Sequence, residues 1–122
     1  KLEIYGNNWP TPDGTAIRDY VHIMDITDAH LLALDYLQRS QPQIINLNLG
    51  SGEGTSVLQL IKIFEVSNDV KINYIFKERR KGDSAYLTAS IQKAKKVLNW
   101  EPLRTKNQMC KDGWNWYLKN LV

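Results

Sequence analysis

Cysteine is almost absent from this chain of 122 residues, which contains a single one, Cys110. One cysteine cannot form a disulfide within the chain, so the sequence does not have the pattern of small disulfide-stapled secreted domains. The apolar runs are only a few residues long, which predicts no helix across a membrane. No basic segment leads into an apolar stretch near Lys1, as it does in a secretory signal. We therefore expect a cytoplasmic protein.

An excess of charge of one sign is also missing. Lys and Arg number 16 and Asp and Glu 13, which gives a net charge of +3. A nucleic-acid-binding face gathers basic residues without acids among them, whereas the densest basic segment, 77–83, includes Glu78 and Asp83. The sequence predicts neither nucleic acid nor a membrane as partner. A free-standing nucleotide-binding or nucleic-acid-binding module stays open on this segment alone.

Hydrophobic residues make up 43% of the chain and charged residues 24%, which is typical of a folded globular domain. Apolar and polar residues alternate over 2–5, 44–49 and 71–76, the period of a half-buried strand, and 20–23 reads as another short extended segment. The length suits one domain. We expect residues 1–122 to form a single mixed α/β domain.

Helices are predicted between these strands. Apolar residues recur three and four apart over 25–39, and again after Thr55 or Ser56, either of which suits an N-cap. Ser90 is expected to cap a short helix, and Thr105 begins a capping-box pattern that opens a final helix. The alternation supports the mixed α/β class.

Glycines 50, 52 and 54 lie between a predicted strand and a predicted helix, where nucleotide-binding loops occur. The dinucleotide fingerprint needs a third glycine where Thr55 stands, and the phosphate-binding loop needs a lysine that Gly54-Thr55-Ser56 lacks. We expect a tight turn. The N–H groups at the start of the following helix leave an anion or the edge of a base as further candidate ligands.

Arginines and an aspartate in two segments carry groups suited to a nucleotide. The segments are Arg79-Arg80-Lys81-Gly82-Asp83 and the neighbourhood of Arg18. A guanidinium binds phosphate oxygens as a fork, and a carboxylate accepts hydrogen bonds from paired sugar hydroxyls. Taken alone, each segment fits a charged surface turn better than a binding site, and Arg18 would then pair with Asp19.

The sequence offers no catalytic set and no metal site. His22 and His30 have no third ligand at metal spacing, and we expect His30 to have a packed, structural role. Cys110 lies in a predicted helix without an activating partner, so we expect it to be inert. No tyrosine has a lysine four residues later, the pair that short-chain reductases use.

Several runs follow one another over nearly the whole chain. The most distinctive is Pro10-Thr11-Pro12-Asp13-Gly14-Thr15, followed by Arg18-Asp19-Tyr20-Val21-His22. Asn48-Leu49-Gly50-Ser51-Gly52 and Arg79-Arg80-Lys81-Gly82-Asp83 come next, and Met109 to Trp116 closes the series. In this order and spacing the runs resemble the C-terminal part of the UDP-glucose 4-epimerase family, which are extended short-chain dehydrogenases/reductases of the NAD-dependent epimerase/dehydratase type.

The resemblance implies an isomerase of galactose metabolism that interconverts UDP-glucose and UDP-galactose. In this family an N-terminal Rossmann domain holds NAD, which takes a hydride from C4 of the sugar and returns it to the other face. Those elements are absent from the 122 residues. We therefore expect the C-terminal portion of a longer, homodimeric enzyme, without its Rossmann domain and inactive alone.

The resemblance also implies UDP-sugar-binding roles for particular residues. Arg18 and Arg80 correspond to the arginines at the diphosphate, and Asp83 to the carboxylate at the ribose. Leu87 corresponds to a position at the sugar pocket that is bulky in some members and small in others. The remaining predicted residues border the uracil and the nucleotide: Glu3, Ile4, Tyr5, Tyr20 and Val57. The alternative is another nucleotide-sugar epimerase or dehydratase of the superfamily, against which the Pro-Thr-Pro-Asp-Gly-Thr run argues.

Overall fold

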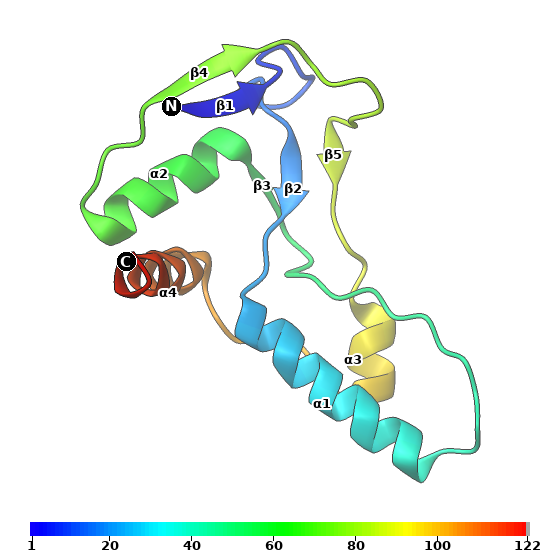
Figure 1. Cartoon of the computed structure of the whole chain (residues 1–122). Helices are drawn as coiled ribbons and strands as arrows, with labels where there is room; N and C mark the ends of the chain where they lie inside the picture. The colour runs from blue at the N-terminus through cyan, green and yellow to red at the C-terminus, as the bar shows by residue number, and fades with distance from the viewer. Residues whose placement is uncertain (122) are drawn as a thin grey trace.

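Strands and helices are interspersed along residues 1–121, which are the part of the chain that the computed structural model describes (Figure 1). The mixed α/β class is therefore as predicted. The elements are, in order, β1 (Leu2–Tyr5), β2 (Ile17–Asp19), α1 (Ile23–Arg39), β3 (Gly54–Ser56), α2 (Val57–Asn68), β4 (Tyr74–Lys77), β5 (Tyr86–Leu87), α3 (Gln92–Leu98) and α4 (Lys106–Lys119).

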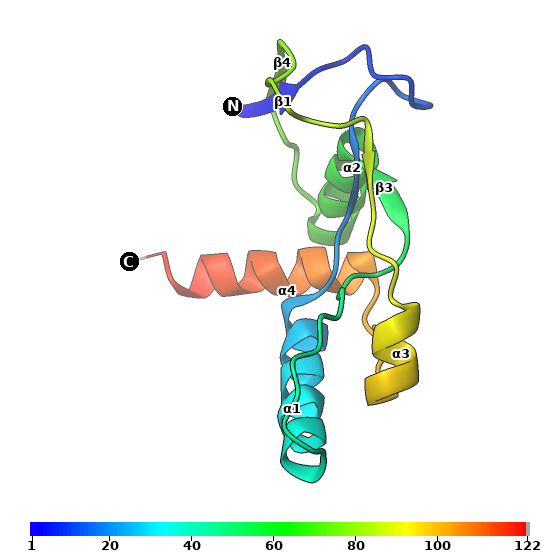
Figure 2. The same ribbon diagram turned by 90° about the vertical axis from the view of Figure 1, so that its right-hand side faces the viewer.

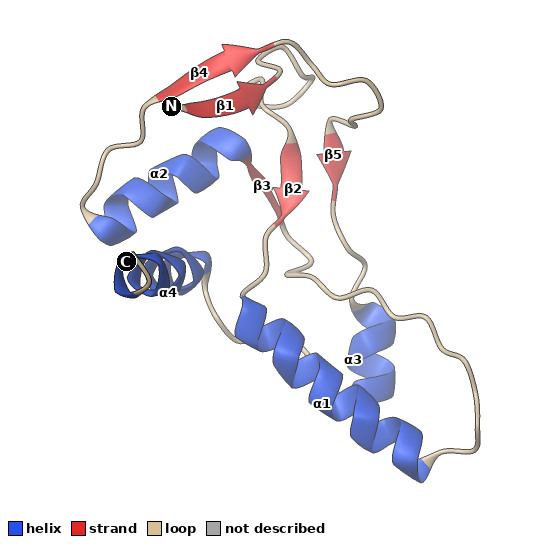
Figure 3. Ribbon diagram, viewed as in Figure 1, coloured by secondary structure: helices blue, strands red, loops and turns tan. Residues whose placement is uncertain are grey.

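The first sheet joins the beginning of the chain to a segment beyond its middle. β1 pairs in parallel with β4, and the register places Tyr5 opposite Lys77. The strand predicted over 2–5 is confirmed, whereas the one predicted over 71–76 begins later, at Tyr74. Because both strands end at the same edge, the loops that follow them start side by side (Figure 3).

The second sheet has the strand order β3-β2-β5, with β2 antiparallel to β3 and parallel to β5. The register places Arg18 between Thr55 on β3 and Leu87 on β5. Three segments far apart in the sequence therefore meet at Arg18.

The helices form two packed pairs: one lies beside the second sheet, and the other lies beyond the end of its strands (Figure 1). α1 packs against α3 around a core of Ala29, Ala94, Leu98 and Trp100, and the Trp100 indole N–H donates to the carbonyl of Asp25 at 2.9 Å. In the other pair α2 packs against α4, which runs across the long direction of α1 (Figure 2). None of the described helices is long and apolar enough to cross a membrane.

Two predicted extended segments differ from the structure. Residues 44–49 form no strand, because no described strand lies alongside them to complete a hydrogen-bonded ladder; Leu47 and Leu49 pack on the α1–α3 core instead. The segment 20–23 is also not a strand. It leads into α1, which begins earlier than predicted because His22 serves as its N-cap, its Nδ1 accepting from the N–H of Met24 at 3.0 Å.

The helix caps were predicted with mixed success. Ser56 caps α2 in a reciprocal capping box, accepting from the N–H of Gln59 while the Gln59 side chain accepts from the Ser56 N–H. Ser90 does not cap α3, whose N-cap is Ile91 without a side-chain hydrogen bond. Thr105 caps α4 by accepting a backbone N–H of the first turn at 3.2 Å.

Candidate functional site

Four predicted site residues form one connected cluster where β1 and β4 end. The Tyr5 hydroxyl donates to Glu3 Oε2 at 2.7 Å. The Arg80 guanidinium lies over the Tyr5 ring, 4.7 Å from its centroid, and Arg80 Nε donates to Asp83 Oδ2 at 3.1 Å. The parallel pairing of β1 with β4 brings these segments together. We call these four residues the Tyr5–Arg80 cluster.

The cluster is charged and open to solvent. The hydrogen bond from Tyr5 and the nearby charge of Lys77 lower the pKa of Glu3, and the same hydrogen bond raises the pKa of Tyr5. The Arg80 side chain is 61% exposed, while the Asp83 side chain is 25% exposed. The cluster thus presents an accessible cation beside an aromatic ring and a carboxylate, which can hold a phosphate, a planar ring and a hydroxyl respectively.

The backbone of β1 adds hydrogen-bonding groups to the cluster. The N–H groups of Leu2 and Gly6 donate to carbonyls of the β4 segment at 2.9 Å each. Because the direction alternates along a strand, the backbone groups of Glu3 and Tyr5 point away from β4 and those of Ile4 point toward it. The Ile4 side chain is buried. Ile4 therefore supports the cluster by packing. Glu3 and the N–H of Tyr5 offer hydrogen-bonding groups at the outer edge of β1, whereas the Tyr5 carbonyl accepts from the Trp9 indole N–H at 3.3 Å.

Arg18 and Leu87 line a separate groove of about 520 Å³ beside β2 and β5. The surface-turn alternative predicted that Arg18 pairs with Asp19. Instead, the Arg18 guanidinium donates to the carbonyl of Ile17 at 2.8 Å. Leu87 is exposed at the groove. Arg80 is not among the residues that line it. The meeting of Arg18 and Arg80 at one diphosphate stays a prediction.

Tyr20 and Val57 lie away from the Tyr5–Arg80 cluster. They line an apolar groove of about 490 Å³ between α2 and α4, together with Phe64 and Met109. Burial raises the pKa of Tyr20, and the charge of Arg18 opposes that shift. The structure therefore divides the predicted site residues into the Tyr5–Arg80 cluster, the Arg18–Leu87 groove and this apolar groove.

Asp19 is a site-forming residue that the sequence analysis missed. Its Oδ1 accepts the N–H of Ser51 at 2.6 Å and the Ser51 hydroxyl at 2.7 Å; its Oδ2 accepts the N–H groups of Gly52 at 3.0 Å and Ala89 at 3.1 Å. Burial raises the pKa of this carboxyl, but the hydrogen bonds outweigh burial and leave it below its ordinary value. The glycine-rich turn thus binds a carboxylate of the chain itself.

The start of α2 is likewise already bonded. The N–H of Val57 donates to the carbonyl of Ala16 at 3.2 Å, and that of Leu58 to Thr15 Oγ1 at 3.4 Å. The N–H of Gln59 donates to the Ser56 cap. The suggestion that this helix start receives an external anion is therefore wrong, since its first amides are satisfied within the fold.

The remaining candidates for chemistry have structural roles. With Nδ1 of His22 accepting from α1, its Nε2 donates to Asp112 at 3.1 Å. His30 is exposed instead of packed, and its Nδ1 donates to a carbonyl of its own helix at 2.7 Å. Burial raises the pKa of the Cys110 thiol, which disfavours the nucleophilic thiolate. Among the described residues, no group of His, Cys, Asp or Glu could hold a metal ion.

The fold is that of the C-terminal portion of an extended short-chain dehydrogenase/reductase. Residues 1–113 match the family model described as GDP-mannose 4,6 dehydratase, and the chain belongs to this family.

Known proteins with similar sequences include UDP-glucose 4-epimerases. The chain is 42% identical over 119 residues to a UDP-glucose 4-epimerase of Cyamopsis tetragonoloba, covering 98% of this chain and 34% of that protein. The UDP-glucose 4-epimerase of Bacillus subtilis is 40% identical over 121 residues, which is 99% of this chain and 35% of that protein. The chain thus spans about a third of the length of these relatives.

Solved structures similar to this chain also include UDP-glucose 4-epimerases. A UDP-glucose 4-epimerase from Stenotrophomonas maltophila, with bound NAD and formylated UDP-arabinopyranose, has a TM-score of 0.92 and 39% identity over 98% of this chain and 35% of that one. The enzyme from Bifidobacterium longum, in complex with NAD⁺ and UDP, has a TM-score of 0.90 and 38% identity over 97% of this chain and 35% of that one.

The described residues do not fit NAD. A dinucleotide site needs free amides at a glycine-rich strand-to-helix turn. Here the Ser51 and Gly52 amides bind Asp19, and the first amides of α2 are bonded within the fold.

Proposed function

We propose that this chain is the UDP-holding portion of a cytoplasmic UDP-glucose 4-epimerase, which interconverts UDP-glucose and UDP-galactose in galactose metabolism. The observation that carries the proposal is the Tyr5–Arg80 cluster, in which two segments far apart in sequence place a cation, an aromatic ring and a carboxylate together. The identity of about 40% to UDP-glucose 4-epimerases supports the same reaction.

Each group of the cluster has a part of UDP to hold. The Tyr5 ring and the outward backbone groups of β1 suit the uracil, and Asp83 suits the ribose hydroxyls. Arg80 uses Nε for Asp83, so its two Nη groups remain for phosphate oxygens, with Arg18 as the second cation. Because this grip acts on the nucleotide and not on the reacting carbon, it anchors the substrate to a similar degree in the ground state and in the transition state.

The hydride chemistry belongs to NAD, bound by a further part of the enzyme. Exposed apolar side chains on α1 and in the loop after it support the presence of such a part: Leu31 is 63% exposed, Leu34 55% and Ile44 95%. Exposed apolar patches are usually covered by another protein surface. We propose that the complete enzyme is a homodimer and that the isolated chain tends to self-associate through these side chains.

The isolated chain is expected to show no epimerase activity, because it lacks the residues that hold NAD and transfer protons. The test is a coupled assay of UDP-galactose conversion to UDP-glucose, with the full-length protein that contains this chain as the positive control. Detectable turnover by residues 1–122 alone, or none by the full-length protein, would contradict the proposal.

A second candidate is another nucleotide-sugar enzyme of the same family, because the matching family model is described by a GDP-mannose dehydratase. The two proposals differ in the base that the Tyr5–Arg80 cluster accepts. UDP, dTDP and GDP should therefore be compared as competitors for the nucleotide site of the full-length protein. Strongest competition by UDP favours the epimerase, and strongest competition by GDP favours the dehydratase.

Leu87 is expected to set the room available for the sugar. A leucine leaves more space at the groove than a tyrosine, so the enzyme should also accept UDP-N-acetylglucosamine. An epimerase from Campylobacter jejuni that is 34% identical is a UDP-Glc/GlcNAc 4-epimerase. Leu87→Tyr should lower kcat/KM for UDP-N-acetylglucosamine about tenfold relative to UDP-glucose, since a filled pocket excludes the acetamido group.

The control for this substitution is Leu103→Tyr, which adds the same bulk at an exposed leucine. It should leave the ratio of the two kcat/KM values unchanged. If Leu87→Tyr changes kcat/KM equally for both substrates, Leu87 does not line the sugar pocket.

A further inference from the structure

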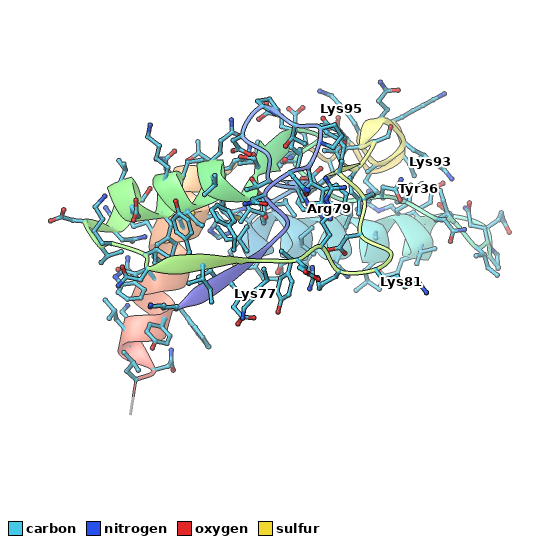
Figure 4. All side chains as sticks on the ribbon, turned by 90° about the horizontal axis from the view of Figure 1, so that it is seen from above. Tyr36, Lys77, Arg79, Lys81, Lys93 and Lys95 are labelled. Atoms are coloured by element: carbon cyan, nitrogen blue, oxygen red, sulfur yellow. The ribbon has the colours of Figure 1, made fainter. Side chains whose placement is uncertain are left out.

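Arg79, the neighbour of Arg80, has contacts that the proposed UDP site does not explain. Its guanidinium lies over the Trp9 indole, 4.0 Å from the ring centroid. Its Nε donates to Asn8 Oδ1 at 2.7 Å, and its Nη2 donates to the Asn8 carbonyl. Arg79 is exposed, and in Figure 4 it lies among the side chains in the middle of the view, whereas Lys81 points outward from the same loop. One side chain thus makes three contacts to the 7–15 loop.

Trp9 connects this contact to the Tyr5–Arg80 cluster. Its indole N–H donates to the carbonyl of Tyr5 at 3.3 Å, and its backbone N–H donates to the carbonyl of Gly14 at 2.9 Å. Gly6, with φ +88°, lies directly beneath: a Cβ there would be 2.4 Å from Trp9 Nε1 and 2.8 Å from Arg79 Cγ. The indole is therefore held between the end of β1 and Arg79 in a space that only glycine leaves open.

The far side of the 7–15 loop is also anchored. The Asp13 carboxylate accepts from the N–H of Thr15 at 2.9 Å, from the Thr15 hydroxyl at 2.7 Å and from the hydroxyl of Ser56 at the start of α2. Burial raises the pKa of Asp13, but these hydrogen bonds outweigh burial and lower it overall. With this side fixed to α2, Arg79 joins the loop to segment 77–83 beyond the last backbone bond of the β1–β4 sheet, from the N–H of Gly6 to the carbonyl of Lys77.

The two adjacent arginines hold two aromatic rings of one short segment. Arg79 lies over Trp9 and Arg80 over Tyr5. Because Arg80 is a long, exposed side chain, its position depends on the backbone that carries it. A fixed Arg79 fixes that backbone next to Tyr5.

We propose that Arg79 is a positioning residue for nucleotide binding: it locks the 7–15 loop to segment 77–83 and thereby holds Arg80 and Tyr5 at the spacing that a uridine diphosphate requires. This proposal rests on the proposed function. The role requires arginine, because a lysine keeps the charge but cannot donate in two directions from a flat group stacked on an indole.

The experiment compares Arg79→Ala and Arg79→Lys with Lys81→Ala in the full-length protein. Lys81 is a neighbouring cation outside the cluster, so its removal controls for the loss of one positive charge. Both Arg79 variants should raise KM for UDP-glucose and Kd for UDP about tenfold, with kcat changed less than about twofold, because a lost grip on the nucleotide affects ground state and transition state alike. Lys81→Ala should change neither value.

Hydrogen exchange without nucleotide gives the second readout. Both Arg79 variants should speed exchange of the backbone N–H of Trp9, whereas the amides of α3 should exchange as before. Faster exchange together with raised KM supports the proposal. Faster exchange with unchanged KM and Kd, unchanged exchange, or full rescue by Arg79→Lys overturns it. If the unaltered protein binds no UDP, the proposed function fails, and the positioning role fails with it even where the loop loosens.

Discussion

Arg80→Ala in the full-length protein is expected to weaken UDP binding about 100-fold. A hydrogen bond between charged groups contributes about 1.5–3 kcal/mol, and every 1.4 kcal/mol is a factor of about ten in Kd. Arg80 offers both Nη groups to the diphosphate, so its loss should fall at the upper end of this range. Isothermal titration with UDP measures the effect.

Arg39→Ala is the matched control for Arg80. Arg39 is 78% exposed near the end of α1 and pairs with Asp35, so it carries the same charge far from the cluster. Its removal should leave the Kd for UDP within about twofold, because Arg39 lies outside the cluster. The fold should also be retained, because a surface ion pair contributes at most about 1 kcal/mol to stability. If Arg80→Ala weakens the affinity for UDP by less than about threefold, Arg80 does not bind the diphosphate.

Asp19→Asn is expected to lower the free energy of unfolding of the chain by about 3 kcal/mol at pH 7. The carboxylate accepts four hydrogen bonds that join β2 to the glycine-rich turn and to the segment after β5. An amide can accept on one oxygen only, so backbone N–H donors lose a charged partner. Urea unfolding followed by circular dichroism measures the change.

The contribution of Asp19 should also depend on pH. Because hydrogen bonds hold the pKa of this carboxyl below its ordinary value of 3.8, the folded chain binds its proton less readily than the unfolded chain. The stabilisation is therefore fully present above the ordinary value and disappears as the pH falls through the lower, folded pKa. Asp19→Asn should remove this acid-side loss from the stability profile.

Asp35→Asn controls for loss of a carboxylate on the surface. Asp35 is 49% exposed and pairs with Arg39 within one helix, so the free energy of unfolding should change by less than about 1 kcal/mol. Equal destabilisation by the two substitutions, or an unaltered acid-side profile in Asp19→Asn, would show that Asp19 does not hold the turn.

The local elements were predictable because their signals are local. The strand at 2–5 and the caps Ser56 and Thr105 follow from periodicity and from side chains that bond nearby amides. The strand predicted over 44–49 failed because a strand also needs a partner, which alternation of side chains does not reveal.

The contact between candidate residues was less predictable than their choice. The resemblance to epimerases led to Tyr5 and Arg80 as candidates, whose binding role stays a prediction, and the parallel register of β1 and β4 explains why the two residues touch. The bonds of Asp19 to the glycine-rich turn and of Arg79 to the 7–15 loop join distant positions by ordinary polar groups. Such pairs have no fixed spacing in the sequence, so no sequence pattern predicts them.

The most direct test is a crystal structure of the full-length protein with UDP. We predict that the guanidinium groups of Arg18 and Arg80 both lie within hydrogen-bonding distance of the same diphosphate, with the uracil against Tyr5 and the outward edge of β1. A UDP molecule bound elsewhere, or one held by neither arginine, would contradict the account.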